Sequence, residues 1–294
     1  YIGNKRALLD FIGTGIDRVR GRLGKERLSV FDVFSGSGVV SRYLKRHARL
    51  LVANDLENYA AVINRCYLAN RSAIDEEVLR ALHAEISARL DGEPLAAGLL
   101  AELYAPDNDE SIRPGERAFY TTRNARYLDT ARMLIDGAPG EFRDFLLAPL
   151  LSEASVHANT SGVFKGFYKN PRTGCGQFGG RKGDALSRIR GDIALPYPVF
   201  SNFECETRVL SGDAAEIAAS VPEVDVAYLD PPYNQHPCSS TTSGPPRSPP
   251  SPGFPRTGTG RPSTDAGTPP RASLPWPRTS ARSFCSSPST PKDS

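Results

Sequence analysis

A glycine-rich turn between a short apolar run and a helix constrains the fold of this chain more than any other feature. Residues 29–34 form the apolar run, Ser35-Gly-Ser-Gly38 follows it, and residues 39–47 have helical spacing. A strand that enters a helix through two glycines lets the backbone approach a ligand, and the start of the helix offers free N–H donors. A second apolar run, residues 50–53, ends at Asp55, about 20 residues on, where an acid meets ribose hydroxyls in nucleotide-binding folds. The pattern predicts a nucleotide-type pocket in an α/β fold.

The turn departs from the dinucleotide-binding pattern at one position. Ser41 stands where the third glycine of that pattern would be. This disfavours a dinucleotide with a pyrophosphate and favours a cofactor without one, such as S-adenosyl-L-methionine. Two structural alternatives stay open: the glycines only make a tight turn, and Asp55 only caps a helix.

Strand and helix patterns alternate at both ends of the first 237 residues. Helical spacing is predicted for residues 5–20, 57–70, 75–90, 123–136 and 141–158, and strands for residues 203–210 and 224–229. Alternation in both flanks predicts an α/β fold with a doubly wound parallel sheet. The chain is therefore divided into a first core part (1–70), a mainly helical insertion (71–202) and a second core part (203–237).

Composition separates residues 238–294 from the rest. Valine and isoleucine are absent there, Leu274 is the only leucine, and most residues are Ser, Thr, Pro, Gly or Arg. Such a segment buries too little apolar surface to offset its ordering entropy, so it is predicted to be disordered.

The net charge and the cysteine pattern indicate which partners, metals and cellular compartment to expect. The net charge of +3 is too small to indicate a nucleic-acid partner by itself. The five cysteines show no CxxC or Cys/His metal spacing, which favours reduced thiols in a cytoplasmic protein and predicts no metal site. No apolar run has the length of a membrane span, and no signal peptide is visible, so no membrane partner is expected.

The tetrapeptide Asp230-Pro-Pro-Tyr233 directly follows the predicted strand at residues 224–229. An aromatic amino group such as N6 of adenine is a poor nucleophile, because its lone pair is delocalised into the ring. Asp230 and the carbonyl of Pro231 can accept its two hydrogens, and the prolines hold both acceptors in place. Tyr233 offers a face on which an extruded base can stack. The alternative is an ordinary Asp-Pro-Pro turn, which the preceding strand and the following tyrosine disfavour.

Basic and aromatic residues alternate in the middle of the chain. The basic residues are Lys165, Lys169, Arg172, Arg181 and Lys182, and Phe164, Phe167, Tyr168 and Phe178 lie between them. Such a segment can neutralise the phosphates of double-stranded DNA, while Asn159, Ser161 or Gln177 can contact base edges. A solvated loop with a few packed aromatic side chains is the alternative.

Together these motifs resemble the Dam-like family of adenine-specific N6 DNA methyltransferases of restriction–modification systems, over residues 1 to about 237. The resemblance implies a Rossmann-like methyltransferase fold with an inserted target-recognition region. It also implies S-adenosyl-L-methionine as cofactor, double-stranded DNA as substrate, flipping of the target base and a cognate restriction endonuclease as partner. The oligomeric state stays unknown.

The family's motifs match this sequence residue by residue. Tyr1-Ile-Gly-Asn-Lys-Arg6 is similar to its N-terminal motif, and Gly212-Asp213 is similar to its acidic motif. The resemblance implies a cofactor site of Tyr1, Gly3, Lys5, Asp32, Phe34, Ser35, Gly36, Gly38, Asp55 and Asp213. It implies a catalytic loop of Asp230, Pro231, Pro232 and Tyr233.

Motif order and loop chemistry separate the alternatives. The long gap between the two motifs leaves room for a target-recognition insertion, whereas small RNA methyltransferases place them closer. The leading Asp favours adenine over cytosine-N4 and protein-glutamine enzymes. An RNA or protein methyltransferase with the same loop remains an alternative.

The family normally continues past the catalytic loop with further strands and helices, and nothing after Pro237 resembles them. A frameshift near residue 238 is therefore a hypothesis, with a genuine disordered extension as its alternative. Under the frameshift hypothesis the chain would be an inactive, DNA-binding remnant.

Overall fold

The computed structural model describes residues 5–160, 166–180, 183 and 185–231. The chain divides into two units, Tyr1–Pro237 and Cys238–Ser294. The second unit lies outside the described residues, so the predictions for residues 238–294 remain predictions.

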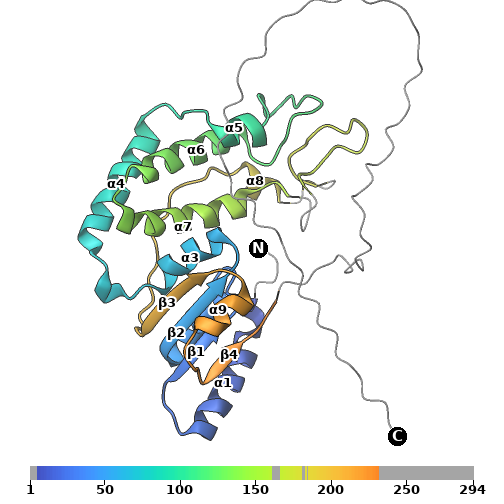
Figure 1. Cartoon of the computed structure of the whole chain (residues 1–294). Coiled ribbons are helices and arrows are strands. Elements are labelled where there is room, and N and C mark those ends of the chain that lie inside the picture. Colours follow the sequence, from blue (N-terminus) through green and yellow to red (C-terminus); the bar gives the residue numbers. More distant parts are fainter. Residues whose placement is uncertain (1–4, 161–165, 181–182, 184, 232–294) are drawn as a thin grey trace, which may run out of the picture. The chain divides into compact units, whose positions relative to one another are not determined.

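The described residues form a mixed α/β structure around one parallel sheet of four strands (Figure 1). The strands are β1 (Leu28–Asp32), β2 (Ala48–Asp55), β3 (Glu206–Ser211) and β4 (Val226–Tyr228), in the order β3-β2-β1-β4. All four predicted strands are confirmed, with bounds shifted by a few residues. The strand order reverses at β1: β2 and β3 are added in turn on one side of β1, and β4 is then added on its other side.

Both faces of the sheet are covered, which explains why its central strands are almost entirely buried. All five residues of β1 are buried, as expected for a parallel strand with helices on both sides. Alternate residues of β1 belong to different apolar clusters: Val30 packs on one face, and Phe31 on the other. The first face is covered by α1 (Leu9–Leu23), α2 (Val39–Leu44) and the end of α3 (Asn58–Leu68), and the second by α9 (Ala214–Ser220).

The residues between β2 and β3 form a mainly helical region with its own core. Its helices are α4 (Glu76–Gly92), α5 (Leu99–Tyr104), α6 (Thr122–Asp136), α7 (Gly140–His157) and α8 (Leu186–Arg190). A cluster that includes Leu79, Ile135 and Leu146 forms this core, and α3 lies between α7 and the sheet (Figure 1).

The predicted helices are all confirmed, and their ends have visible causes. The Asp75 side chain accepts a hydrogen bond from the Val78 N–H and starts α4, and Thr121 starts α6 in the same way. The helix predicted over residues 39–47 ends in a 3₁₀ turn, Lys45–His47. The helix predicted over residues 5–20 begins with a 3₁₀ turn, Lys5–Leu8. The 3₁₀ turn Arg71–Ala73 and the short helices α5 and α8 were not predicted. Within the described part of the chain, no helix is both long and apolar enough to cross a membrane.

Candidate active site

The glycine turn and the Asp230 loop, far apart in the sequence, lie at the same edge of the sheet. Asp32 at the end of β1 is in register with Tyr228 at the end of β4, and the Val33 N–H donates to the Tyr228 carbonyl over 3.0 Å. Ligands of open parallel sheets bind at the carboxyl ends of the strands, where the strand order reverses. This edge is therefore the candidate active site.

The two glycines of the turn are needed for different reasons. Both have positive φ angles, +50° at Gly36 and +70° at Gly38, which strain any other L-residue. A Cβ atom at Gly36 would meet no atom within 4 Å, so this glycine faces open space. A Cβ atom at Gly38 would lie 2.4 Å from Oδ1 of Asn64, so Gly38 lies against protein. Only Gly36 faces space that a ligand can fill.

Asp55 contacts the turn and also supports the start of α3. Its Oδ2 accepts a hydrogen bond from the Gly36 N–H at 2.8 Å, and its Oδ1 accepts from the Glu57 N–H at 3.0 Å. The N-cap residue of α3 is Glu57 and not Asp55, and among the described residues no side chain caps this helix, so the capping alternative for Asp55 is wrong. Carboxylate oxygens can each accept more than one hydrogen bond, so these contacts are compatible with the predicted ribose-binding role.

Asp32 is a buried acid at the centre of the edge. It is only 1% exposed, and its Oδ2 accepts a hydrogen bond of 2.5 Å from the Ser41 hydroxyl in α2. Its Oδ1 has no hydrogen-bond partner among the described residues. Burial raises the pKa of Asp32 to about 7; the Ser41 hydrogen bond opposes this rise, and the Asp55 and Asp230 carboxylates add to it. Ser41, which departs from the glycine pattern, therefore binds the acid of the preceding strand.

Asp230 is paired with a lysine from the other end of the chain. The Lys5 ammonium lies 3.0 Å from Oδ2 of Asp230, and the two side chains are 16% and 21% exposed. The sequence placed Lys5 with the cofactor, whereas this contact joins it to the loop that is predicted to be catalytic. Pro231 follows Asp230 on the exposed surface. The other predicted residues of these two motifs, Tyr1, Gly3, Pro232 and Tyr233, lie outside the described residues.

Asp225, the residue before β4, holds this strand in place at the amino end of the sheet, opposite the candidate site. Oδ2 of Asp225 accepts hydrogen bonds from the Ser29 N–H at 2.7 Å and the Ser29 hydroxyl at 2.9 Å. The Lys25 ammonium lies 2.5 Å from Oδ1 of the same carboxylate. These hydrogen bonds, with Lys25 contributing most, lower the pKa of Asp225 to about 2. These contacts of Asp225 fix the register of a three-residue strand, and with it the position of Asp230.

Asp213 lies close to this edge but has a structural partner. Its carboxylate accepts hydrogen bonds from the N–H groups of Ala215 and Glu216 and so caps α9. The neighbouring Gly212 N–H donates to the Asp55 carbonyl over 3.1 Å, which ties the end of β3 to the end of β2. The predicted contact of Asp213 with the cofactor remains a prediction. Phe34 packs with the apolar cluster on the α9 side of the sheet.

The basic middle of the chain contains a tight hairpin. Lys169 and Gly176 form an antiparallel bridge, and the Asn170 side chain accepts from the Arg172 N–H at the turn. Arg172 is exposed at the tip, and the Lys169 ammonium lies 5.4 Å from the centre of the Phe167 ring. The other predicted phosphate contacts, Lys165, Arg181 and Lys182, lie outside the described residues.

Asn159 is not available as a base-reading residue. It is fully buried, and its amide donates to the carbonyls of Ala118 and Gln177 and accepts from the Gly179 N–H. The suggestion that it contacts base edges is therefore wrong; Asn159 connects the hairpin to the helical region instead.

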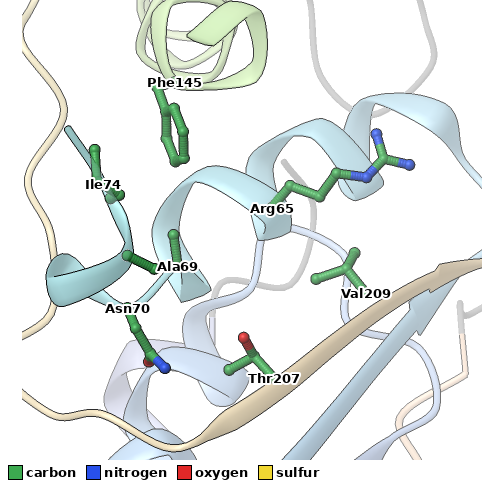
Figure 2. A pocket seen from close by; sticks show the side chains of 8 residues that line it. Arg65, Ala69, Asn70, Ile74, Phe145, Thr207 and Val209 are labelled. Carbon is green, nitrogen blue, oxygen red and sulfur yellow. The ribbon is translucent and has the colours of Figure 1, made fainter. Parts of the chain in front are cut away.

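A separate hollow of about 370 Å³ lies over β3, away from the candidate site (Figure 2). Its walls come from α3, the turn after it, α7 and β3, and Figure 2 shows Phe145 and Ile74 above Thr207 and Val209. None of its lining residues is among the predicted site residues. Among the described residues, no group of three or more His, Cys, Asp or Glu side chains is placed to hold a metal ion.

Three polar residues around the turn were missed by the sequence analysis as parts of the site. Asn54 donates to the carbonyls of Val33 and Gly212, and Asn64 donates to the Ser35 hydroxyl. Ser41 binds Asp32 as described above. In the sequence, each of these residues is visible only as an amide or hydroxyl side chain within an otherwise apolar strand or helix face. That pattern does not identify the group to which the side chain binds.

The geometry defines a parallel α/β protein with a glycine turn and an acidic loop at one edge of its sheet. The sequence matches the profile of the D12 class N6 adenine-specific DNA methyltransferases over residues 1–244, so the chain belongs to this family. It is 30% identical over 244 residues to the type II methyltransferase M.NlaIII of Neisseria lactamica, covering 80% of this chain. It is 26% identical over 242 residues to the type II methyltransferase M.CviAII of Paramecium bursaria Chlorella virus 1, again covering 80% of this chain.

A modification methylase of Lactococcus lactis subsp. lactis, LlaI, is 25% identical over 249 residues, covering 79% of this chain and 35% of the relative. The chain spans 64% of the length of each of the first two relatives. No solved structure is significantly similar to the chain.

Proposed function

We propose that this chain transfers a methyl group from S-adenosyl-L-methionine to N6 of adenine in double-stranded DNA. The observation that carries the proposal is the meeting of the glycine turn and Asp230 at the reversal point of the sheet. In this proposal the fold is a Rossmann-like methyltransferase core of residues 1–70 and 203–237, with residues 71–202 as the inserted target-recognition region. The separate apolar core of the helical region supports that division.

The residues at the edge suit a positively charged nucleoside ligand. Gly36 faces open space, and the buried Asp32 carboxylate has an oxygen without a partner among the described residues. A cationic ligand nearby would favour the ionised form of this carboxyl group. When bound, S-adenosylmethionine supplies an electrophilic methyl group. The proposed cofactor site comprises Tyr1, Gly3, Lys5, Asp32, Phe34, Ser35, Gly36, Gly38, Asp55 and Asp213.

The proposed catalytic loop prepares the amino group of the target base. Asp230 accepts a hydrogen bond from adenine N6, and the carbonyl of Pro231 accepts the second, which localises the nitrogen lone pair. Pro232 stiffens the loop, and Tyr233 stacks on the base once it is flipped out of the duplex. Lys5 orients the Asp230 carboxylate before the base arrives, as their 3.0 Å contact suggests.

The hairpin in the inserted region is the proposed contact with the DNA backbone. Arg172 at its tip and Lys169 on its arm are both exposed, as residues that neutralise phosphates must be. Lys165, Arg181 and Lys182 are proposed to extend this contact. A cognate restriction endonuclease as functional partner and a cytoplasmic location belong to the same proposal.

Transfer of a labelled methyl group to duplex DNA, followed by nucleoside analysis, tests the function. Label in N6-methyladenine is the expected result, and Asp230→Ala should abolish it while S-adenosylmethionine still binds in a calorimeter. Label in RNA or protein would support the alternative enzyme class. DNA binding without transfer would identify an inactive remnant.

A further inference from the structure

We propose that Asn64, in α3, is a positioning residue that holds the glycine turn, residues 35–38, in its cofactor-binding conformation. This inference rests on the proposed function of the turn and adds a residue to it. Asn64 does not contact the open space beside Gly36, so its action is through the backbone of the turn.

The side-chain amide of Asn64 connects α3 to the turn. Its Nδ2 lies 3.0 Å from the Ser35 hydroxyl, 3.2 Å from the Gly36 carbonyl and 2.8 Å from the Ala60 carbonyl. Asn64 is only 1% exposed, so water does not compete for these contacts. Two N–H groups thus serve three acceptors, two of which belong to the turn.

The surrounding acceptors fix the orientation of the amide. If the amide were rotated by half a turn, its oxygen would face the carbonyls of Gly36 and Ala60, and their like partial charges would repel. In the observed orientation, Oδ1 has no hydrogen-bond partner among the described residues and lies against Gly38. Asn64 therefore contacts the turn at two points: it binds the carbonyl of Gly36, and its Oδ1 excludes a side chain at Gly38.

Backbone hydrogen bonds already hold the two ends of the turn: the Ser35 N–H donates to the Asn54 carbonyl and the Gly38 N–H to the Ser35 carbonyl, each over 2.8 Å. The groups of Gly36, between them, are bound by side chains. Two residues of the turn have positive φ angles, and within the described residues no side chain caps the start of α2. The Gly36 N–H is bound by Asp55 and the Gly36 carbonyl by Asn64. Together they fix the peptide groups on both sides of the glycine that faces open space.

Replacement by aspartate keeps the shape of the side chain, removes both N–H donors when ionised and turns a carboxylate oxygen toward the carbonyls of Gly36 and Ala60. In Asn64→Asp, S-adenosylmethionine affinity measured by calorimetry should fall about tenfold or more, as expected for the loss of a buried hydrogen bond. Asn64→Ala should give a smaller loss in the same direction, and it carries the test if the aspartate variant does not fold.

Asn70 provides a matched control. Its side chain pairs with the backbone of Cys205, donating to the carbonyl and accepting from the N–H, just past the end of α3 and away from the turn. Asn70→Ala should lower the thermal unfolding temperature as much as Asn64→Ala does, yet leave S-adenosylmethionine affinity within about twofold, because its lost hydrogen bonds lie outside the turn. Equal affinity losses in both variants would indicate only general destabilisation and overturn the proposal.

A second measurement uses the contact between Asn64 and Gly38. Gly38→Ala places a methyl group against Oδ1 of Asn64 and should weaken cofactor binding. In the double variant Gly38→Ala/Asn64→Ala this collision is absent. Its S-adenosylmethionine affinity should therefore be higher than the product of the two single losses predicts. Affinity losses that simply multiply would contradict the proposed contact. Wild-type protein that does not bind S-adenosylmethionine at all would instead refute the proposed function, and the inference with it.

Discussion

The buried carboxyl group of Asp32 should make the stability of this protein depend on pH in a defined interval. Burial raises the pKa of Asp32 from 3.8 to about 7 in the folded protein. Between these values the native state binds the proton more tightly than the unfolded chain does. The stabilising contribution of this group is therefore complete below pH 3.8 and lost as pH rises through about 7.

The magnitude follows from the linkage relation. Within the interval the free energy of unfolding falls by about 1.4 kcal/mol per pH unit for one group. From pH 5 to pH 8 the loss from Asp32 is then about 3 kcal/mol, a large part of the stability of a typical domain. An asparagine side chain at this position cannot ionise, but its oxygen can still accept the hydrogen bond from Ser41. The substitution Asp32→Asn should therefore remove this dependence.

Urea unfolding of the wild type and Asp32→Asn at pH 5 and pH 8 measures the effect directly. The free energy of unfolding of the variant relative to the wild type should rise by about 3 kcal/mol between the two pH values. Asp225→Asn is the control: the pKa of Asp225 is lowered to about 2, so its stabilisation is lost only as pH falls below the ordinary value of 3.8. The difference in the free energy of unfolding between Asp225→Asn and the wild type should therefore be the same at pH 5 and pH 8. A pH-independent difference for Asp32→Asn would refute the reasoning.

Three further outcomes are expected. Gly36→Val should lower S-adenosylmethionine affinity about tenfold or more in calorimetry, because φ is +50° there and the side chain would enter the open space; unchanged affinity would place the cofactor elsewhere. Iodoacetamide should label Cys175 in the native protein but not Cys66, since burial raises the pKa of the Cys66 thiol; mass spectrometry that finds Cys66 modified first would contradict this. Arg172→Ala should weaken DNA binding for all sequences and reduce the salt slope by about one in fluorescence anisotropy, whereas an unchanged slope would exclude a phosphate contact.

The parts of the fold that were predictable are those with a local cause. Buried parallel strands leave apolar runs, and the two glycines of positive φ mark the turn after β1. The strand before Asp230 was recognisable by its apolar run as well, although its position beside β1 in the sheet was not. The short helices α5 and α8 were missed because a helix of five or six residues leaves little periodicity.

The contacts around the site could not be derived from the sequence, because they join elements that only the tertiary fold brings together. Lys5 meets Asp230 only after β4 has joined β1. Asn64 serves the turn because α3 packs beside it, and Asn159 was misassigned because its polarity suggested a surface residue. A polar side chain shows that it needs a partner, whereas its partner depends on the packing of distant segments.

The late position of β4 in the chain has a consequence for biosynthesis. Asp225, which anchors β4, lies 196 residues after its partner Ser29. At a synthesis rate of about 5–20 residues per second, a ribosome takes about 10–40 s to add that stretch. During this time one edge of β1 has no native strand beside it, while the helical region can form its own core. Among the described strands, the one that carries Asp230 is thus added last, and any chain that pairs with the unpaired edge of β1 competes directly with the native β4.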